Sequence, residues 1–283
     1  MRDSLLLLVK GRSRSAGVAN AKATHILLED FVIPMCGRYV ITSPPDAIRT
    51  LFGYGERPNF PARYNVAPTQ PIPTVRLADG KRTFALMRWG FIPAWVDDPK
   101  TLSLLINARG ESLLDKPAFR NAMRRRRCLF PADGFYDWRA GEPKRPYFVR
   151  AKSGTRLAFA GLWETWTGPN GEEVDTAAIV TTRSTRALAA IHERMPVIVA
   201  PEAFDLWLDC AAVEAEAAAA LIAPAPEALL EHYEVSPAVN RVANDSAELI
   251  APASAVADTA SPATEPQSTP AKPKQPDDEL SLF

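Results

Sequence analysis

Cysteine and net charge are both scarce in this sequence, and each shortage excludes a class of protein. Only three cysteines, Cys36, Cys128 and Cys210, occur among 283 residues. Their odd number and wide spacing argue against a disulfide framework and against a zinc site, and they fit a reducing cytoplasm. Basic and acidic side chains cancel to a formal net charge of zero, so no global field attracts nucleic acid or an anionic membrane. A nucleic-acid site would have to be a local basic groove.

The chain also lacks a long hydrophobic run near its start. The apolar stretch at residues 5–9 is far too short to span a bilayer. Lys10, Arg12 and Arg14 follow this stretch, which is the wrong order for a secretory signal. The composition, 47% hydrophobic and 23% charged, is typical of a soluble globular protein. We therefore expect a cytoplasmic protein, and no pattern calls for a metal or another cofactor.

Three segments differ in their sequence pattern. Residues 1–34 have mixed charge and no sustained period, which indicates an N-terminal extension that is absent or removed in the active form. Residues 35–250 have the composition of a folded domain. From residue 251 to residue 283, Pro, Ala, Ser and Thr dominate. Such a tail cannot bury enough apolar surface to offset its ordering entropy, so we expect it to be disordered.

Short apolar stretches separated by turn residues predict many strands and few helices. Ser43 is predicted to cap a helix that begins at Pro44 and ends before Gly53. The polar residues 64–70, with Pro68 among them, predict a loop, and residues 78–80 predict a turn between two strands. Strands are expected over residues 38–42, 72–77, 83–89, 104–109, 128–130, 135–138, 147–151, 157–162 and 177–182, and helices over 44–52, 112–123, 184–191, 201–208 and 211–222. No βαβ rhythm is present, so we predict an α+β single domain with a mostly antiparallel, partly barrel-like sheet and flanking helices.

Cys36 carries the most specific chemistry, because it directly follows Met35. At the start of a chain, cysteine has a free α-amine and a thiol on adjacent carbons. The amine can form an imine with an aldehyde, which an amide nitrogen cannot do because its lone pair is delocalised. The thiol can then close a five-membered thiazolidine ring. The reference pKa values, about 7.7–8.0 for the amine and about 8.5 for the thiol, suit both groups to near-neutral pH.

This chemistry requires that Cys36 be the first residue of the active protein. Either translation begins at Met35 and the methionine is trimmed, or the protein cleaves its own Met35–Cys36 bond. The plainer interpretation of Cys36 is a small buried hydrophobe.

Four polar clusters could act with Cys36, and each also has a plainer interpretation. Residues 107–111 end an apolar stretch with an amide, a guanidinium and a carboxylate, or they are a strand end that meets water. Asp137 lies among aromatic residues, where desolvation would raise its pKa and suit it to proton transfer, or it is a solvated carboxylate. His192 could transfer protons or cap a helix. The arginines at residues 124–127 could follow phosphates or form a solvated face.

Taken together, these blocks resemble the SOS-response-associated peptidase (SRAP) family, whose members crosslink abasic sites in single-stranded DNA. The resemblance spans about residues 36–250. Its motifs are Cys-Gly-Arg-Tyr at 36–39, Tyr-Asn-Val-Ala-Pro-Thr at 64–69, Trp-Gly-Phe-Ile-Pro-Ala-Trp at 89–95, Ile-Asn-Ala-Arg at 106–109, Pro-Ala-Asp-Gly-Phe-Tyr-Asp-Trp at 131–138, Ile-His-Glu-Arg-Met-Pro at 191–196, Val-Asn at 239–240 and Ala-Glu-Leu-Ile at 247–250.

The resemblance implies a role for each matching residue. Cys36 would form the crosslink, Asn107 would orient the reacting amine and sugar, and His192 would assist opening of the deoxyribose ring. Self-processing peptidase activity and weak lyase activity are implied as well. The positions at which the family contacts DNA correspond to Arg38, Asn65, Trp95, Arg109 and Thr181.

Asp137 departs from the family, which usually has glutamate at this position. The shorter side chain withdraws the carboxylate by one methylene, about 1.5 Å. Because proton transfer needs hydrogen-bond reach, we expect steps that use this carboxylate to be slower or to use an intervening water.

The last five residues, Glu-Leu-Ser-Leu-Phe at 279–283, suggest a protein partner. They resemble the short motif by which bacterial repair proteins bind the sliding clamp of the replicative polymerase. Leu280, Leu282 and Phe283 would fill a hydrophobic pocket at the end of a flexible tether. The usual glutamine of that motif is Glu279 here.

Two other functions stay open at this point. A glutamine amidotransferase of the N-terminal-nucleophile class also begins with Cys-Gly, and its thiol attacks an amide. A single-strand-binding module would bind DNA without a covalent adduct. In each case we expect a monomer, and in the DNA-binding cases one that associates with the nucleoid through DNA.

Overall fold

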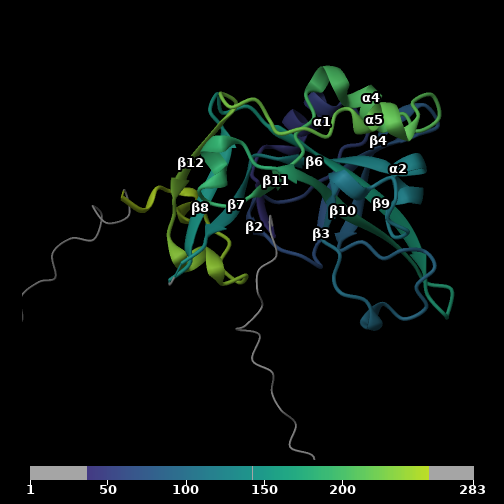
Figure 1. Ribbon diagram of the computed structural model, residues 1–283, viewed down its shortest axis with the longest axis horizontal. Coiled ribbons are helices and arrows are strands. Elements are labelled where there is room, and N and C mark those ends of the chain that lie inside the picture. The colour runs from purple at the N-terminus through teal and green to yellow at the C-terminus, as the bar shows by residue number, and fades with distance from the viewer. Residues whose placement is uncertain (1–36, 142, 255–283) are drawn as a thin grey trace, which may run out of the picture. The chain divides into compact units, whose positions relative to one another are not determined.

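The computed structural model of the protein describes residues 37–141 and 143–254. Cys36, residues 1–34 and most of the predicted tail, with its Leu280, Leu282 and Phe283, lie outside the described residues. The described part is an α+β domain built from two sheets and short helices, which confirms the predicted fold class (Figure 1). None of its helices is long and apolar enough to cross a membrane.

One sheet has five antiparallel strands in the order β12-β8-β7-β1-β2. They are β1 (Arg38–Ile41), β2 (Arg63–Val66), β7 (Gly134–Arg139), β8 (Arg145–Ala151) and β12 (Leu230–Glu234). β1 lies between β2 and β7, and all its residues are buried. The chain that follows Cys36 is therefore held on both sides by its neighbours.

The second sheet closes on itself as a five-stranded ring. Its strands are β3 (Pro71–Ala78), β4 (Lys81–Trp89), β6 (Arg127–Ala132), β9 (Leu157–Thr167) and β10 (Glu173–Arg183), and β9 pairs back with β10. Two further strands, β5 (Asn107–Arg109) and β11 (Arg194–Pro196), pair with β10 outside the ring. β10 runs parallel to β4 and β5, and the other pairings are antiparallel, so the predicted barrel-like sheet is confirmed.

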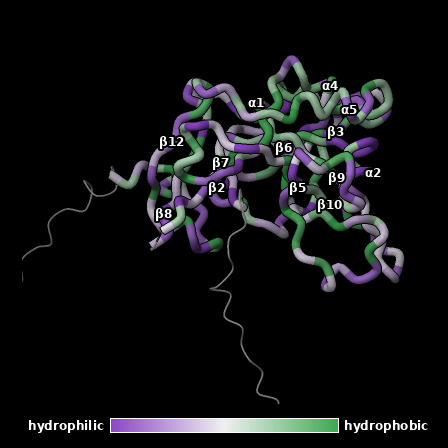
Figure 2. Tube along the Cα trace, viewed as in Figure 1, coloured by the Kyte–Doolittle hydropathy of each residue, from purple (hydrophilic) through white to green (hydrophobic). Residues whose placement is uncertain are grey.

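Closure of the ring leaves it without an open edge, because each strand pairs on both sides. Figure 2 shows hydrophobic and hydrophilic stretches mixed along the chain. In β1 and β6 every residue is buried, so these strands are covered on both faces.

The β3–β4 hairpin forms as the sequence predicts. Asp79 and Gly80 connect the strands, with φ angles of 50° and 70°, and Ala78 pairs with Lys81. Positive φ at both central residues defines the type I′ turn, which Asp-Gly adopts readily and which matches the twist of the strands.

The helices are α1 (Pro45–Phe52), α2 (Arg120–Arg125), α3 (Arg186–Ala189), α4 (Phe204–Leu208) and α5 (Ala215–Ala219). Short 3₁₀ turns are η2 (Pro99–Thr101), η3 (Gly110–Ser112), η4 (Pro201–Ala203), η5 (Pro237–Asn240) and η6 (Ala247–Ile250). Most are shorter than predicted. The helix expected over 112–123 is reduced to α2, because Pro117 disfavours a helical conformation at the residue before it.

The predicted capping role of Ser43 is wrong. Pro44 occupies the cap position of α1 and Pro45 is its first residue, and no side chain caps the helix. The Ser43 hydroxyl donates instead to Asp133, whose carboxylate also accepts the backbone N–H groups of Thr42 and Ser43 at 2.6 and 2.7 Å. The predicted end of α1 is confirmed, since Gly53 is left-handed with φ 73°.

The arginine run at residues 124–127 is split between solvent and core. Arg124 and Arg125 are exposed, whereas Arg127 is only 1% exposed. Arg127 donates to backbone carbonyls at the ends of α2 and α4 and before α5, those of Met123, Trp207, Asp209 and Val213. One buried guanidinium thus joins three helices, and the run is not a single phosphate-binding surface.

Replacing Arg127 with Met should lower the free energy of unfolding by about 3 kcal/mol or more, because four carbonyls lose a charged donor. Urea unfolding measures the loss. The matched control is Arg125→Met on exposed α2, which should change stability by less than about 0.5 kcal/mol. Equal losses in the two variants would contradict this account.

Candidate active site

Arg38 fixes the first strand to the loop after β12. Its guanidinium is buried and donates to Asn65 Oδ1 at 2.9 Å and to the Val239 carbonyl at 2.9 Å. Asn65 is fully buried, and its amide nitrogen donates to the carbonyls of Val239, Arg241 and Asn244. The structure therefore brings these two predicted DNA-contact residues together, with both side chains engaged inside the protein.

Asp137 lies on β7, beside the start of β1. Arg38 pairs with Tyr136, so continuing this register by one residue sets Gly37 across from Asp137. The Asp137 side chain is buried, and burial raises its pKa to about 7, although the Trp138 N–H donates to Oδ1 at 3.0 Å and opposes the shift. The prediction that desolvation would raise this pKa is confirmed.

His192 follows α3 and is held in one tautomer. The backbone N–H of Arg194 donates to its Nδ1 at 3.1 Å, so the neutral ring carries its proton on Nε2. Desolvation lowers the pKa of His192. The side chain is therefore a neutral donor through Nε2 at physiological pH, rather than a cation that caps a helix.

Asp137 and His192 line the same narrow crevice. Apolar side chains make up half of its wall, and the full lining is Phe135, Asp137, Val149, Ser184, Leu188, Ile191, His192 and Arg194. The structure thus places a carboxyl group with a pKa of about 7 and a neutral imidazole in one desolvated place. Two such groups can exchange protons with a ligand.

A second group of predicted residues lies where β5 pairs with β10. Asn107 is opposite Ile179, and Arg109 is opposite Thr181. Thr181 is buried, and Arg194 donates to both its hydroxyl and its carbonyl. Arg194 also pairs with Glu111, at 3.0 and 2.8 Å.

The Glu111–Arg194 pair connects the two groups. Glu111 follows Asn107 and Arg109 in the chain, and Arg194 lines the crevice with His192. The hydrogen bonds from Arg194 lower the pKa of Glu111, so the pair stays charged at neutral pH. The segment that carries Asn107 is thereby tied to the segment that carries His192.

Arg109 and Trp95 remain on the surface. Arg109 is exposed, and the Trp95 side chain is 64% exposed, which is unusual for so large an aromatic residue. Neither residue lines the crevice. Both are accessible from solvent.

Two crevice residues, Ser184 and Arg194, were not singled out by the sequence. Arg194 belongs to the motif at 191–196, which could have drawn attention to it. Ser184 has no sequence signal, since serine is common in the segment before a helix.

The described cysteines and acidic residues offer no second reactive centre. Burial raises the pKa of the Cys128 thiol well above its usual value, and such a thiol is a poor nucleophile. Among the residues that the structure describes, no group of three His, Cys, Asp or Glu side chains could hold a metal ion.

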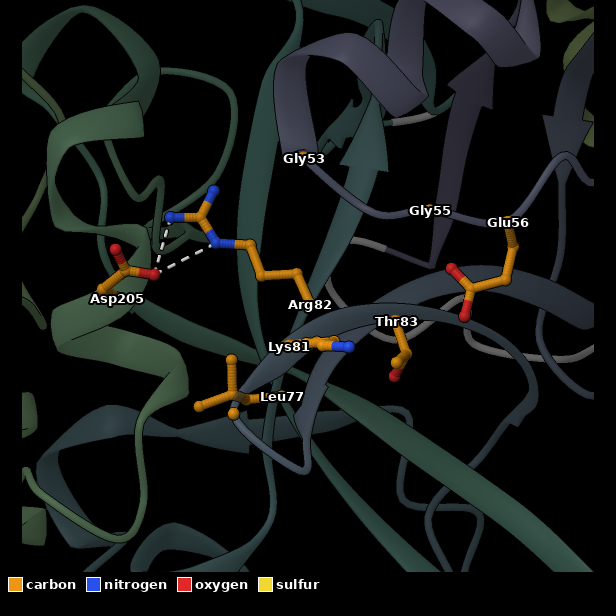
Figure 3. A pocket seen from close by; sticks show the side chains of 9 residues that line it. Gly53, Gly55, Glu56, Leu77, Lys81, Arg82, Thr83 and Asp205 are labelled. Atoms are coloured by element: carbon orange, nitrogen blue, oxygen red, sulfur yellow. Dashed lines mark hydrogen bonds and ion pairs between the residues drawn. The ribbon is translucent and has the colours of Figure 1, made fainter.

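A larger, open cavity of about 520 Å³ shares no lining residue with the crevice. It lies between the end of α1, the β3–β4 hairpin and Asp205 (Figure 3). Arg82 points across it to Asp205, at 2.6 and 3.1 Å, and also donates to the Phe52 carbonyl. The Arg82 guanidinium in this cavity is thus already paired with the Asp205 carboxylate.

The fold and the crevice define a barrel-containing α+β protein with a buried carboxyl group and a neutral imidazole in one crevice. Comparison with known proteins identifies the family. The model of the SOS response associated peptidase (SRAP) family matches residues 35–242, and the chain belongs to that family.

Its relatives include abasic site processing proteins. Abasic site processing protein YoqW of Bacillus subtilis is 38% identical and is matched over 76% of this chain and 99% of its own length. Abasic site processing protein HMCES of Rattus norvegicus is 31% identical, over 77% of this chain and 76% of its own. A crystal structure from Bacteroides thetaiotaomicron shares the fold, with a TM-score of 0.68 and 22% identity, over 77% of this chain and 99% of its own.

Replacing Asp137 with Asn should remove a pH-dependent loss of stability. The folded-state pKa of about 7 lies above the reference value of 3.8, so the folded protein retains a proton that the unfolded chain releases. The parent should therefore lose on the order of 3 kcal/mol of unfolding free energy as the pH rises from about 4 to above 7. Urea unfolding at pH 5 and pH 8 measures the loss. An equal loss in parent and variant would contradict the assignment.

Proposed function

We propose that the protein captures abasic sites in single-stranded DNA as a thiazolidine crosslink on Cys36, as a monomer that shields the lesion. The crevice carries this proposal, because it sets Asp137 and His192 beside the strand that Cys36 precedes. The family membership and the names of the relatives support the choice of lesion.

The covalent chain supports a role for Cys36. Gly37 is buried directly before β1, across from Asp137 in the extended register. A peptide bond joins Cys36 to Gly37, which limits the separation of their Cα atoms to about 3.8 Å. Because Cys36 is bonded to Gly37, we propose that its amine and thiol act together with Asp137.

The reaction begins with opening of the sugar. An abasic deoxyribose is mostly a closed hemiacetal, so the C1′ hydroxyl must lose a proton and the ring oxygen must gain one as the C1′–O bond breaks. We assign the proton shuttle to Asp137, whose pKa of about 7 allows both protonation states. His192 donates a hydrogen bond through Nε2 to the ring oxygen as it departs.

Capture then takes place in two steps. The Cys36 amine, oriented by Asn107, adds to the C1′ aldehyde and loses water to give an imine. The thiol adds across the carbon–nitrogen double bond, and its proton passes to the nitrogen. Ring closure traps the imine before β-elimination can break the strand, and slow closure would give weak lyase activity. Self-cleavage before Cys36 would supply the free amine if translation begins upstream.

DNA would lie over the exposed residues. Arg109 can contact a phosphate, and Trp95 offers a ring on which a base can stack. Arg38, Asn65 and Thr181 have their side chains bonded inside the protein. In this proposal they position the backbone that DNA meets.

Denaturing electrophoresis with single-stranded DNA that contains one abasic site tests the proposal. Protein that begins at Cys36 should give a heat-stable adduct, Cys36→Ala none, and Cys36→Ser at most an adduct that heating destroys. The matched control is Cys210→Ala, at a partly exposed cysteine, which should crosslink like the parent. A heat-stable adduct with Cys36→Ser would contradict the scheme.

We also propose that residues 279–283 bind the sliding clamp, on the sequence resemblance of this motif. Deletion of residues 280–283 should weaken binding to purified clamp about tenfold or more, as measured by surface plasmon resonance, because it removes three apolar anchors. Ser281→Ala keeps those anchors and should bind like the parent. Unchanged binding after the deletion would exclude this partner site.

A further inference from the structure

Ser184 has a buried hydroxyl that makes no hydrogen bond. It lies between β10 and α3, its Oγ is inaccessible to solvent, and no described residue is its partner. The usual task of a serine at this position, capping the helix, is performed by Thr185, whose hydroxyl accepts the Leu188 N–H at 3.3 Å. A buried unpaired hydroxyl costs about 1–3 kcal/mol and calls for an explanation.

The hydroxyl belongs to the crevice that contains Asp137 and His192. The other polar groups there have assigned partners: Arg194 binds Glu111 and Thr181, and Nδ1 of His192 accepts from Arg194. The rest of the wall is apolar. Ser184 therefore provides a hydroxyl that is available to a group whose charge changes during the reaction.

The narrowness of the crevice favours a direct contact, because it has no room for a water molecule between its walls. Asp137 is one methylene shorter than a glutamate would be at this position, which sets its carboxylate back by about 1.5 Å. A short polar side chain that lines the same crevice can approach such a carboxylate.

We propose that Ser184 is a positioning residue for the proton shuttle, and that its hydroxyl donates a hydrogen bond to the Asp137 carboxylate whenever that group has released its proton. This inference rests on the proposed function. The proton of Asp137 passes to the sugar ring oxygen as the C1′–O bond breaks, and Ser184 keeps its own proton throughout. The hydrogen bond stabilises a charge that the crevice would otherwise disfavour.

Several groups near Asp137 are already engaged elsewhere. His192 is neutral, and the Arg194 guanidinium is held by Glu111. Tyr147, which pairs with Asp137 from β8, donates its hydroxyl to Glu234.

The test begins with titration of the Asp137 carboxyl by carbon-13 NMR, which requires no DNA. Ser184→Ala should raise the pKa of Asp137 by about one unit, since the ionised form loses a charge-assisted hydrogen bond. Ser184→Thr retains a hydroxyl and should titrate like the parent. The matched control is Ser153→Ala, an exposed serine that bonds only to Thr155. An unchanged pKa in Ser184→Ala would overturn the inference.

A double-mutant cycle tests the link to the shorter carboxylate. Ser184→Ala should slow crosslinking about tenfold at pH 7 in the parent, but less than about threefold when Asp137 is also replaced by Glu. Equal slowing in the two backgrounds would overturn the inference. If the parent forms no adduct at all, the proposed function fails, while the NMR titration still decides whether Ser184 contacts Asp137.

Discussion

The structure depends on burying the charge of Arg38 inside the five-stranded sheet. A guanidinium taken out of water must have its donors satisfied, and Asn65 with the Val239 carbonyl provides this. Because these partners come from β2 and from the loop after β12, one side chain fixes β1 against distant parts of the chain. The backbone pairing of β1 with β7 sets Gly37 across from Asp137, and the proposed chemistry of Cys36 depends on this placement.

Desolvation also sets the protonation states of Asp137 and His192 in the crevice. Asp137 and His192 carry opposite charges when ionised, and burial shifts their pKa values in opposite directions. At pH 7 His192 is therefore neutral, while Asp137 exchanges readily between its protonated and ionised forms. The Glu111–Arg194 pair keeps its charges outside this exchange and holds the Asn107 and His192 segments together.

Local signals in the sequence predicted much of this structure, whereas features that depend on distant residues were missed. Asp79-Gly80 predicted its hairpin because the turn is decided by those two residues. The strand β2 was predicted as a loop, since its pairing with β1 is not visible in its own polar sequence. Ser43 was predicted as a cap, but Asp133, 90 residues away, binds its hydroxyl. The crevice joins β7, the segment before α3 and the start of β11, so no local pattern could have placed Ser184 in it.

The central claim is that a free amine and a thiol on Cys36 together capture an abasic sugar. Tandem mass spectrometry of the crosslinked, protease-digested complex tests it most directly. The account predicts a peptide that begins at Cys36 and carries the abasic strand on that residue through its sugar, with a mass increase equal to that oligonucleotide minus one water. A crosslinked peptide in which residues before Cys36 are still attached, or a sugar on another residue, would contradict it.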